Sequence, residues 1–185
     1  MGIHYIGEMD KGELNRTLLD QITDGQLEWT KLLNPYDITT IGSGETYREY
    51  PIYCDSARFA SELKKRFPRE EHGAIDQYVK LVEEHMKGYD DIVGALKLVP
   101  LALAQLLIKT GVVKFLNKHL TNQRTTADVI RSLTKDKDLQ TIFSYCWGDY
   151  GSPPEESSFI TQALLMQHFW KCGGKPWHNF SDLLQ

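Results

Sequence analysis

The side chains best able to bind a metal ion or to act as nucleophiles are spread widely along the chain. No two histidines are three or four residues apart, the spacing that places two zinc ligands on one face of a helix, and no CxxC or HExxH motif occurs. A GxSxG nucleophile turn is also missing from the sequence. The sequence therefore predicts no metal site and no nucleophilic centre. The residues concerned are His4, His72, His85, His119, His168, His178, Cys54, Cys146 and Cys172.

Two other groups of residues invite a chemical interpretation. The segment Gly42-Ser43-Gly44 lacks the lysine and the helix that follow in a phosphate-binding loop, so a turn is the expected structure. A set of aromatic residues could line a pocket for an apolar ligand or could belong to the hydrophobic core, and the sequence leaves both open. These aromatic residues are Tyr47, Tyr50, Tyr53, Trp147 and Tyr150.

Composition limits the class of protein. The 185 residues carry a formal net charge of -4 and are 41% hydrophobic, which excludes a disordered chain and argues against general nucleic-acid binding. The odd number of cysteines favours free thiols over a disulfide framework, and no secretory signal peptide is expected. A complete flavin or nicotinamide oxidoreductase rarely fits, because a dinucleotide-binding unit alone takes about 150 residues.

The elements that would position these residues follow from hydrophobic periodicity. Residues 36–53 are rich in β-branched and aromatic residues on both sides of a glycine-rich turn. They predict a hairpin, in which Pro51 marks an edge strand. Helical spacing predicts helices over 12–22, 55–67 and 75–88, the last ending near Gly88, and further helices near 125–133, 139–146 and 158–170. The fold class is therefore helix-rich α+β, with a small antiparallel β-hairpin unit joined to a helical array.

The middle of the chain is both apolar and basic. Residues 92–108 carry one charge, Lys97, but Pro100 and that lysine weaken a membrane-spanning interpretation. Residues 92–127 contain no Asp or Glu and five basic side chains, so association of residues 92–124 with an anionic membrane surface is one interpretation. The other is a pair of core helices whose lysines extend into water. The five basic residues are Lys97, Lys109, Lys114, Lys118 and Arg124.

Several strings together resemble the retinol 13,14-reductases of the carotenoid and phytoene desaturase-like flavoprotein family. The first is Gly2-Ile3-His4-Tyr5-Ile6-Gly7, and the likeness extends to about Lys171. The resemblance implies a membrane-associated oxidoreductase of retinol and lipid metabolism in the endoplasmic reticulum. Such an enzyme saturates the 13,14 double bond of all-trans-retinol, or a similar apolar polyene, with FAD and NAD(P)H. The other matching segments are 19–29, 35–38, 49–53, 65–71, 75–82, 150–151 and 163–165.

The resemblance also implies site residues. Gly2, His4 and Gly7 match the string that lies beside the flavin, so they are the expected cofactor-binding residues. The catalytic acid stays unknown, with His4 and Tyr5 as the titratable or hydroxylic groups of that string.

The glycine-rich FAD fingerprint of the family and its second half have no counterpart in this sequence. Residues 1–171 are therefore expected to be the substrate or cap region as an internal fragment, with 172–185 as a divergent tail and the dinucleotide-binding region absent. Such a chain is expected to be inactive alone. The alternatives are a non-catalytic module that binds retinoids, other apolar ligands or a membrane surface, and an unstable product without function.

Overall fold

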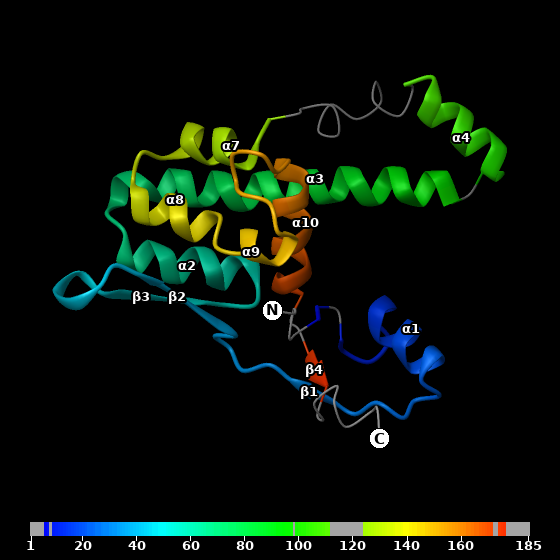
Figure 1. Cartoon of the computed structure of the whole chain (residues 1–185), viewed down its shortest axis with the longest axis horizontal. Coiled ribbons are helices and arrows are strands. Elements are labelled where there is room, and N and C mark those ends of the chain that lie inside the picture. Colours follow the sequence, from blue (N-terminus) through cyan, green and yellow to red (C-terminus); the bar gives the residue numbers. More distant parts are fainter. Residues whose placement is uncertain (1–5, 8, 98, 112–123, 172–173, 177–185) are drawn as a thin grey trace. The chain divides into compact units, whose positions relative to one another are not determined.

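The computed structural model describes residues 6–7, 9–97, 99–111, 124–171 and 174–176 (Figure 1). The chain divides into two compact units: unit one is Met1–His72 with Leu165–Gln185, and unit two is Gly73–Leu164. The elements in chain order are α1 (Leu14–Ile22), β1 (Trp29–Lys31), β2 (Asp37–Ile41), η1 (Gly44–Thr46), β3 (Arg48–Ile52), α2 (Ser56–Arg66), η2 (Arg69–Glu71), α3 (His72–Lys97), α4 (Leu101–Lys109), α7 (Thr126–Leu133), α8 (Lys137–Phe143), α9 (Trp147–Tyr150), α10 (Phe159–Trp170) and β4 (Gly174–Pro176).

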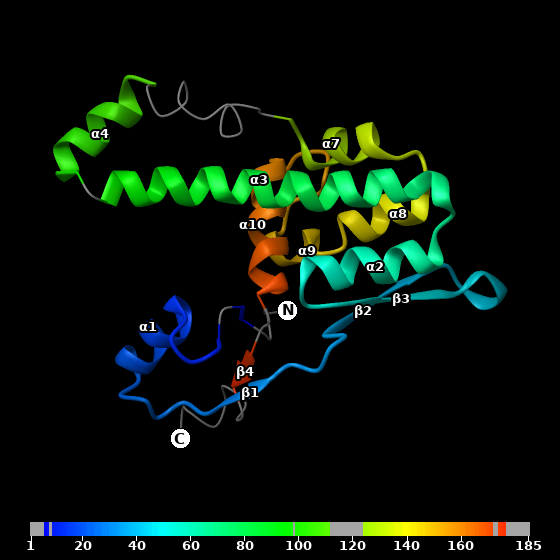
Figure 2. The ribbon, with the colours of Figure 1, turned by 180° about the vertical axis from the view of Figure 1, so that it is seen from behind.

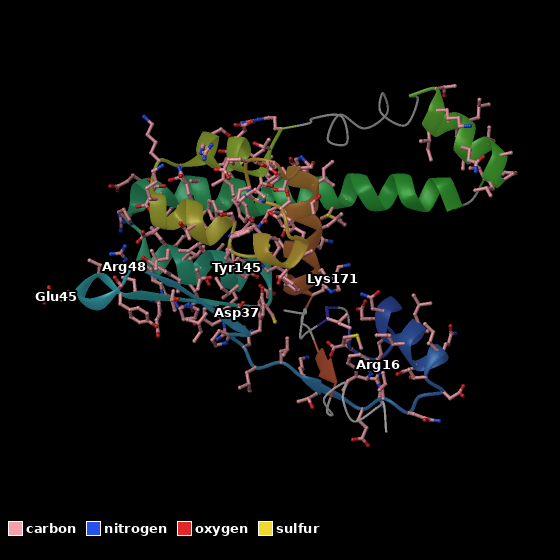
Figure 3. The ribbon with its side chains drawn as sticks, in the orientation of Figure 1. Arg16, Asp37, Glu45, Arg48, Tyr145 and Lys171 are labelled. Carbon is pink, nitrogen blue, oxygen red and sulfur yellow. The ribbon has the colours of Figure 1, made fainter. Side chains whose placement is uncertain are left out.

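The hairpin expected over 36–53 is confirmed in unit one. Strands β2 and β3 pair antiparallel, with Asp37 opposite Ile52 and Ile41 opposite Arg48. Gly42 has a φ of 90°, and a Cβ there would lie 2.3 Å from the carbonyl oxygen of Thr46. The turn therefore requires glycine at position 42, and Gly42-Ser43-Gly44 forms a turn, as expected. In Figure 3 Glu45 lies at the tip of the hairpin, with Arg48 at the start of the returning strand.

Helix α2 follows the hairpin, and Asp55 is its N-cap. The Asp55 carboxylate accepts a hydrogen bond of 2.9 Å from the backbone N–H of Arg58, and the helix ends at Arg66 before Pro68. Its apolar face is buried, and Phe67 stacks on Tyr50 of β3 with the ring centroids 5.6 Å apart. This stacking joins the hairpin to the helix that follows it.

The last turn of α10 completes the core of unit one. The Trp170 ring lies 5.5 Å from the Phe59 ring of α2, and the carbonyl oxygen of Trp170 accepts a 2.9 Å hydrogen bond from the N–H of Asp55. Phe169 packs at 5.8 Å against Tyr36. Residues more than a hundred positions apart thus form one core.

A second two-stranded sheet of unit one was not expected from the sequence. Strand β1 pairs antiparallel with β4, and Thr30 lies opposite Lys175. Each strand has three residues, which is too short for a period-two pattern to be recognised.

Unit two is built around the first half of α3 (Figure 2). Tyr78 of α3 is fully buried, stacks on Phe143 of α8 at 4.0 Å, and meets Phe159 of α10 edge-on at 6.3 Å. The Thr125 hydroxyl caps α7 by accepting from the N–H of Asp128. The helices expected over 75–88, 125–133, 139–146 and 158–170 are all present, which confirms the helix-rich α+β class.

The end of α3 was predicted wrongly. The helix continues past Gly88 to Lys97, because one glycine inside a helix costs only about 1 kcal/mol while each further residue adds a backbone hydrogen bond. The apolar run 92–108 is instead divided between α3 and α4, and Pro100 is the N-cap of α4. Among the described residues no helix has both the length and the apolarity to cross a membrane.

Candidate functional site

Only one of the three expected cofactor-binding residues lies in the described part of the chain. Gly2 and His4 fall outside the described residues, as does Tyr5, while Gly7 lies inside them. Of these three residues, Gly7 is therefore the one whose contacts the structure describes.

Gly7 makes a close backbone contact with the last turn of α10 in unit one. Its N–H donates a 2.7 Å hydrogen bond to the Nε2 atom of His168, and its carbonyl oxygen accepts a 3.3 Å bond from the Nδ2 atom of Asn15. A Cβ at position 7 would lie 1.9 Å from the carbonyl oxygen of His168, so no larger residue fits without movement. The string that contains Gly7 is thus anchored to α10 and α1.

His168 takes a defined role in this contact. Because its Nε2 atom accepts a hydrogen bond, the neutral imidazole carries its proton on Nδ1, and a doubly protonated ring could not accept from Gly7. In the sequence, His168 is notable only as a histidine that has no second histidine three or four residues away. Its separation from Gly7 by 161 residues left no local signal by which the pair could be found.

Three buried polar atoms of unit one have no hydrogen-bond partner among the described residues. They are Nε1 of Trp29, Oγ1 of Thr30 and Nε1 of Trp170. Buried polar side-chain atoms without a partner are rare in folded proteins, so these three atoms are exceptions to the usual pairing. Trp170 itself is 7% exposed and lies two residues from His168 in α10.

A connected polar network occupies the core of unit two, with the fully buried Gln162 at its centre. The Nε2 atom of Gln162 donates to the carbonyl oxygen of Phe143 at 2.7 Å and to the Tyr78 hydroxyl at 3.2 Å. Its Oε1 atom accepts from the Tyr150 hydroxyl at 2.9 Å and from the Cys146 thiol at 3.3 Å. The amide of Gln162 therefore uses both its donors and both its acceptor positions.

The titratable members of this network stay neutral. Burial raises the pKa of the Cys146 thiol to about 12, and burial also raises the pKa values of Tyr78 and Tyr150. A thiol with so high a pKa does not form the thiolate that nucleophilic catalysis requires. The network is consequently a structural element. Cys54 and Cys146 are free, as the sequence predicted, and both are buried, while Cys172 lies outside the described residues.

A cavity beside α7 and α8 in unit two is small for an apolar polyene. It has a volume of about 210 Å³, below the roughly 300–1,000 Å³ of typical ligand pockets. Its lining combines apolar residues such as Ile130 with polar ones such as Lys137 and Arg131, and Arg131 is paired with Glu155. Within the described ranges, no three His, Cys, Asp or Glu side chains are grouped to hold a metal ion.

The aromatic residues separate into core and surface positions. Tyr50 is buried, whereas Tyr47 is half exposed and donates to the Glu49 carboxylate at 2.6 Å. The guanidinium of Arg58 lies 4.7 Å from the centre of the Tyr53 ring, and Trp147 is also exposed. The interpretation of these residues as one ligand pocket therefore finds no support among the residues described.

A dinucleotide such as FAD needs a glycine-rich turn between a strand of a parallel sheet and the N-terminus of a helix. In the part of the chain that the structure describes, both sheets are antiparallel and two-stranded, and no turn of this kind occurs. The described residues thus do not fit the pyrophosphate.

Comparison with known proteins gives one consistent result. The chain is 42% identical to all-trans-retinol 13,14-reductase of Danio rerio over 170 residues, which are 91% of this chain and 28% of that protein. It is 37% identical to the Homo sapiens protein of the same name over 183 residues, 98% of this chain and 30% of that protein. A protein of Danio rerio named inactive all-trans-retinol 13,14-reductase is 33% identical over 90% of this chain.

These comparisons confirm the resemblance seen in the separate strings, which covers nearly the whole chain. The chain spans about 30% of the length of the relatives it matches. No family model and no solved structure matches it.

Proposed function

We propose that this chain supplies the substrate-side region of a retinol 13,14-reductase, an oxidoreductase that saturates one double bond of all-trans-retinol. The observation that carries this proposal is the identity of 37–42% with reductases of that name over 91–98% of the chain. The proposal concerns one region, because the chain spans under a third of those relatives.

The rest of the proposed chemistry follows from the resemblance. FAD would supply the hydride, with a reduced nicotinamide as its source, and the reaction would take place at the endoplasmic reticulum membrane, where an apolar polyene concentrates. Since the described residues do not hold a pyrophosphate, we assign them no step of the hydride transfer. Their role is to anchor the string around Gly7 through His168 and Asn15.

A chimera tests this proposal. Residues 6–171 would replace the matching region of the Danio rerio reductase, and conversion of all-trans-retinol would be measured in the FAD-loaded protein. Retention of retinol conversion is expected, since the substituted region is 42% identical to the one it replaces. A chimera that is folded and carries flavin, yet does not turn over retinol, would contradict the proposal.

The 185-residue chain itself provides a second readout. The alternative function, a non-catalytic module for retinoids or apolar surfaces, is favoured by the exposed leucines of α4. Quenching of tryptophan fluorescence by retinol, together with a chimera that lacks activity, would favour that module. The relative named inactive makes this distinction necessary, because this region is similar both to a protein named a reductase and to one named an inactive reductase.

A further inference from the structure

Helix α1 turns its apolar side toward solvent. Leu18 and Ile22 lie four positions apart on one side of this helix and are 45% and 77% exposed. Arg16 and Asp20 form a 2.8 Å ion pair on the opposite side, and their side chains are only 20% and 36% exposed. A surface helix normally shows the reverse order, with its charged side in water and its apolar side covered. The apolar side of α1 is therefore uncovered among the described residues.

The uncovered side of α1 adjoins the string that contains Gly7. Asn15 lies three positions before Leu18 and seven before Ile22, so these three side chains share one side of the helix. The Nδ2 atom of Asn15 donates a 3.3 Å hydrogen bond to the carbonyl oxygen of Gly7. The apolar surface formed by Leu18 and Ile22, which we term the α1 face, thus begins next to a residue that the resemblance implies to lie beside the flavin.

Charge and area limit what can cover the α1 face. Residues 8–28 carry six acidic and two basic side chains, a net charge of -4. An anionic lipid surface would repel this segment, and so would the same segment of a second copy. Two exposed side chains also offer far less than the roughly 800 Å² that each partner of a stable dimer buries. A covering surface within the same polypeptide needs no such area, because its effective concentration is high.

The length of the relatives identifies a partner within the same polypeptide. More than two thirds of each matched reductase lies outside the region that this chain spans. The described residues do not hold the pyrophosphate of FAD, so in a flavin-dependent protein of that length the remaining part must bind the nucleotide. Since the resemblance implies that the Gly7 string lies beside the flavin, that part also approaches α1, which is attached to the string through Asn15.

We propose, as a consequence of the proposed function, that the α1 face is the surface on which the nucleotide-binding part of a full-length reductase packs. That part covers Leu18 and Ile22 with apolar side chains, and basic residues at its edge pair with the acidic residues around α1. In the 185-residue chain the same face stays open to water.

Labelling of a cysteine on the α1 face tests this proposal. Ile22→Cys would be introduced into the 185-residue chain and into the chimera that carries residues 6–171 in the Danio rerio reductase. Mass spectrometry would then measure the rate of maleimide labelling at position 22. We expect labelling to be at least about tenfold slower in the chimera, because a covered thiol reacts only when the interface opens. Equal rates in the two proteins would overturn the proposal.

Leu33→Cys is the matched control. Leu33 is 85% exposed in unit one and lies outside α1, so its labelling rate should be the same in the chain and in the chimera. Equal slowing at positions 22 and 33 would contradict the assignment to α1. A cysteine at the aligned position of the natural Danio rerio reductase repeats the measurement, so the test does not depend on the folding of the chimera.

Paired glutamine variants give a second readout. Leu18→Gln with Ile22→Gln should lower the thermal midpoint of the chimera by at least about 5 °C, because two amides enter an apolar interface. The same pair should shift the midpoint of the 185-residue chain by less than about 2 °C, because both side chains are exposed there. Leu33→Gln with Ile38→Gln changes a comparably exposed leucine and isoleucine elsewhere in unit one and should shift neither midpoint. A chimera that tolerates the α1 pair as well as the chain does would contradict the proposal.

Retinol conversion by the chimera separates this proposal from the proposed function. An active chimera in which position 22 stays accessible would overturn the α1 interface and leave the reductase function standing. An inactive chimera in which position 22 is protected would contradict the reductase function and support the interface. Slower labelling of the 185-residue chain at higher concentration, or with anionic vesicles, would assign the α1 face to a second copy or to lipid and overturn the proposal.

Discussion

Gly7 and His168 are joined by a 2.7 Å hydrogen bond across 161 residues of sequence. The bond runs from the backbone N–H of Gly7 to the imidazole Nε2, and the carbonyl oxygen of His168 fills the space that a side chain at position 7 would need. This contact holds the segment that resembles the flavin-adjacent string against the last turn of α10. Gly7 is thus a residue that the resemblance implies to lie beside the flavin and whose contacts the structure describes.

Substitution of Gly7 should destabilise unit one. In Gly7→Ala the new Cβ would lie 1.9 Å from the backbone oxygen of His168, so either the 6–7 segment or the helix end must move. We expect a loss of about 1–3 kcal/mol in the free energy of unfolding, as for overpacked sites. Urea titration followed by circular dichroism measures the change.

Gly73→Ala is the matched control for that experiment. Gly73 lies in α3, and a Cβ there meets no atom within 4 Å. Alanine should therefore stabilise the chain by about 0.5–1 kcal/mol through helix propensity. If both glycine variants raised the stability, the close contact at Gly7 would be wrong.

Asp55 combines a favourable cap with an unfavourable backbone conformation. Its carboxylate caps α2, yet its φ is 76°, a region that non-glycine residues rarely occupy. Asp55→Ala should cost about 1 kcal/mol by losing the cap, whereas Asp55→Gly should stabilise by about 1 kcal/mol because relief of the backbone exceeds the loss of the cap. Denaturant unfolding of the two variants gives the sign.

Asp136 supplies the comparison for this prediction. It caps α8 by accepting from the N–H of Leu139, with an ordinary φ of -66°. Both Asp136→Ala and Asp136→Gly should therefore reduce the stability, the alanine variant by about 1 kcal/mol. The prediction for Asp55 fails if glycine is as harmful there as it is at Asp136.

Gln162 should be among the most sensitive polar residues of unit two. Gln162→Leu leaves the Tyr150 hydroxyl and the Cys146 thiol without their buried acceptor, at an expected cost of about 2–3 kcal/mol. Gln77→Leu on the exposed side of α3 is the control and should change the stability by less than about 0.5 kcal/mol. Equal effects of the two variants in urea unfolding would exclude a structural role for the network.

The sequence predicted the helices in which buried apolar residues recur at a regular spacing along the chain. Helices α2, α8 and α10 have the apolar residues of their spacing patterns at fully or largely buried positions, because each pattern reflects one face toward a core. The turn at Gly42 was predictable for a different reason, since turn chemistry depends on a few neighbouring residues.

The features that the sequence did not reveal depend on distant residues. Strand β1 has three residues and is defined by its pairing with β4, and Gly7 is defined by its contact with His168. Gln162 is fully buried in α10 because partners from α3, α8 and α9 surround its amide. A local pattern contains none of these partners.

Cys146 should be unreactive in the folded chain. Its side chain is buried and its pKa is raised to about 12, so the thiolate fraction near pH 8 is very small. With Cys54→Ser and Cys172→Ser in place, a disulfide reagent should modify Cys146 at least about a hundredfold more slowly in buffer than in denaturing urea. Equal rates in the two conditions would contradict the burial of this thiol, provided that the protein in buffer shows the native circular dichroism spectrum.

The same raised pKa predicts a loss of stability in alkaline solution. The unfolded thiol releases its proton near pH 9, while the folded thiol keeps it until about pH 12. This contribution to stability is therefore fully present below pH 9 and is lost as the pH rises toward 12, at no more than about 1.4 kcal/mol per pH unit. Tyr78 adds to the loss above pH 10, because burial raises its pKa as well. Urea unfolding at several pH values should show a shallower alkaline decline in Cys146→Ala than in the unaltered chain, and parallel declines would show that the thiol does not contribute.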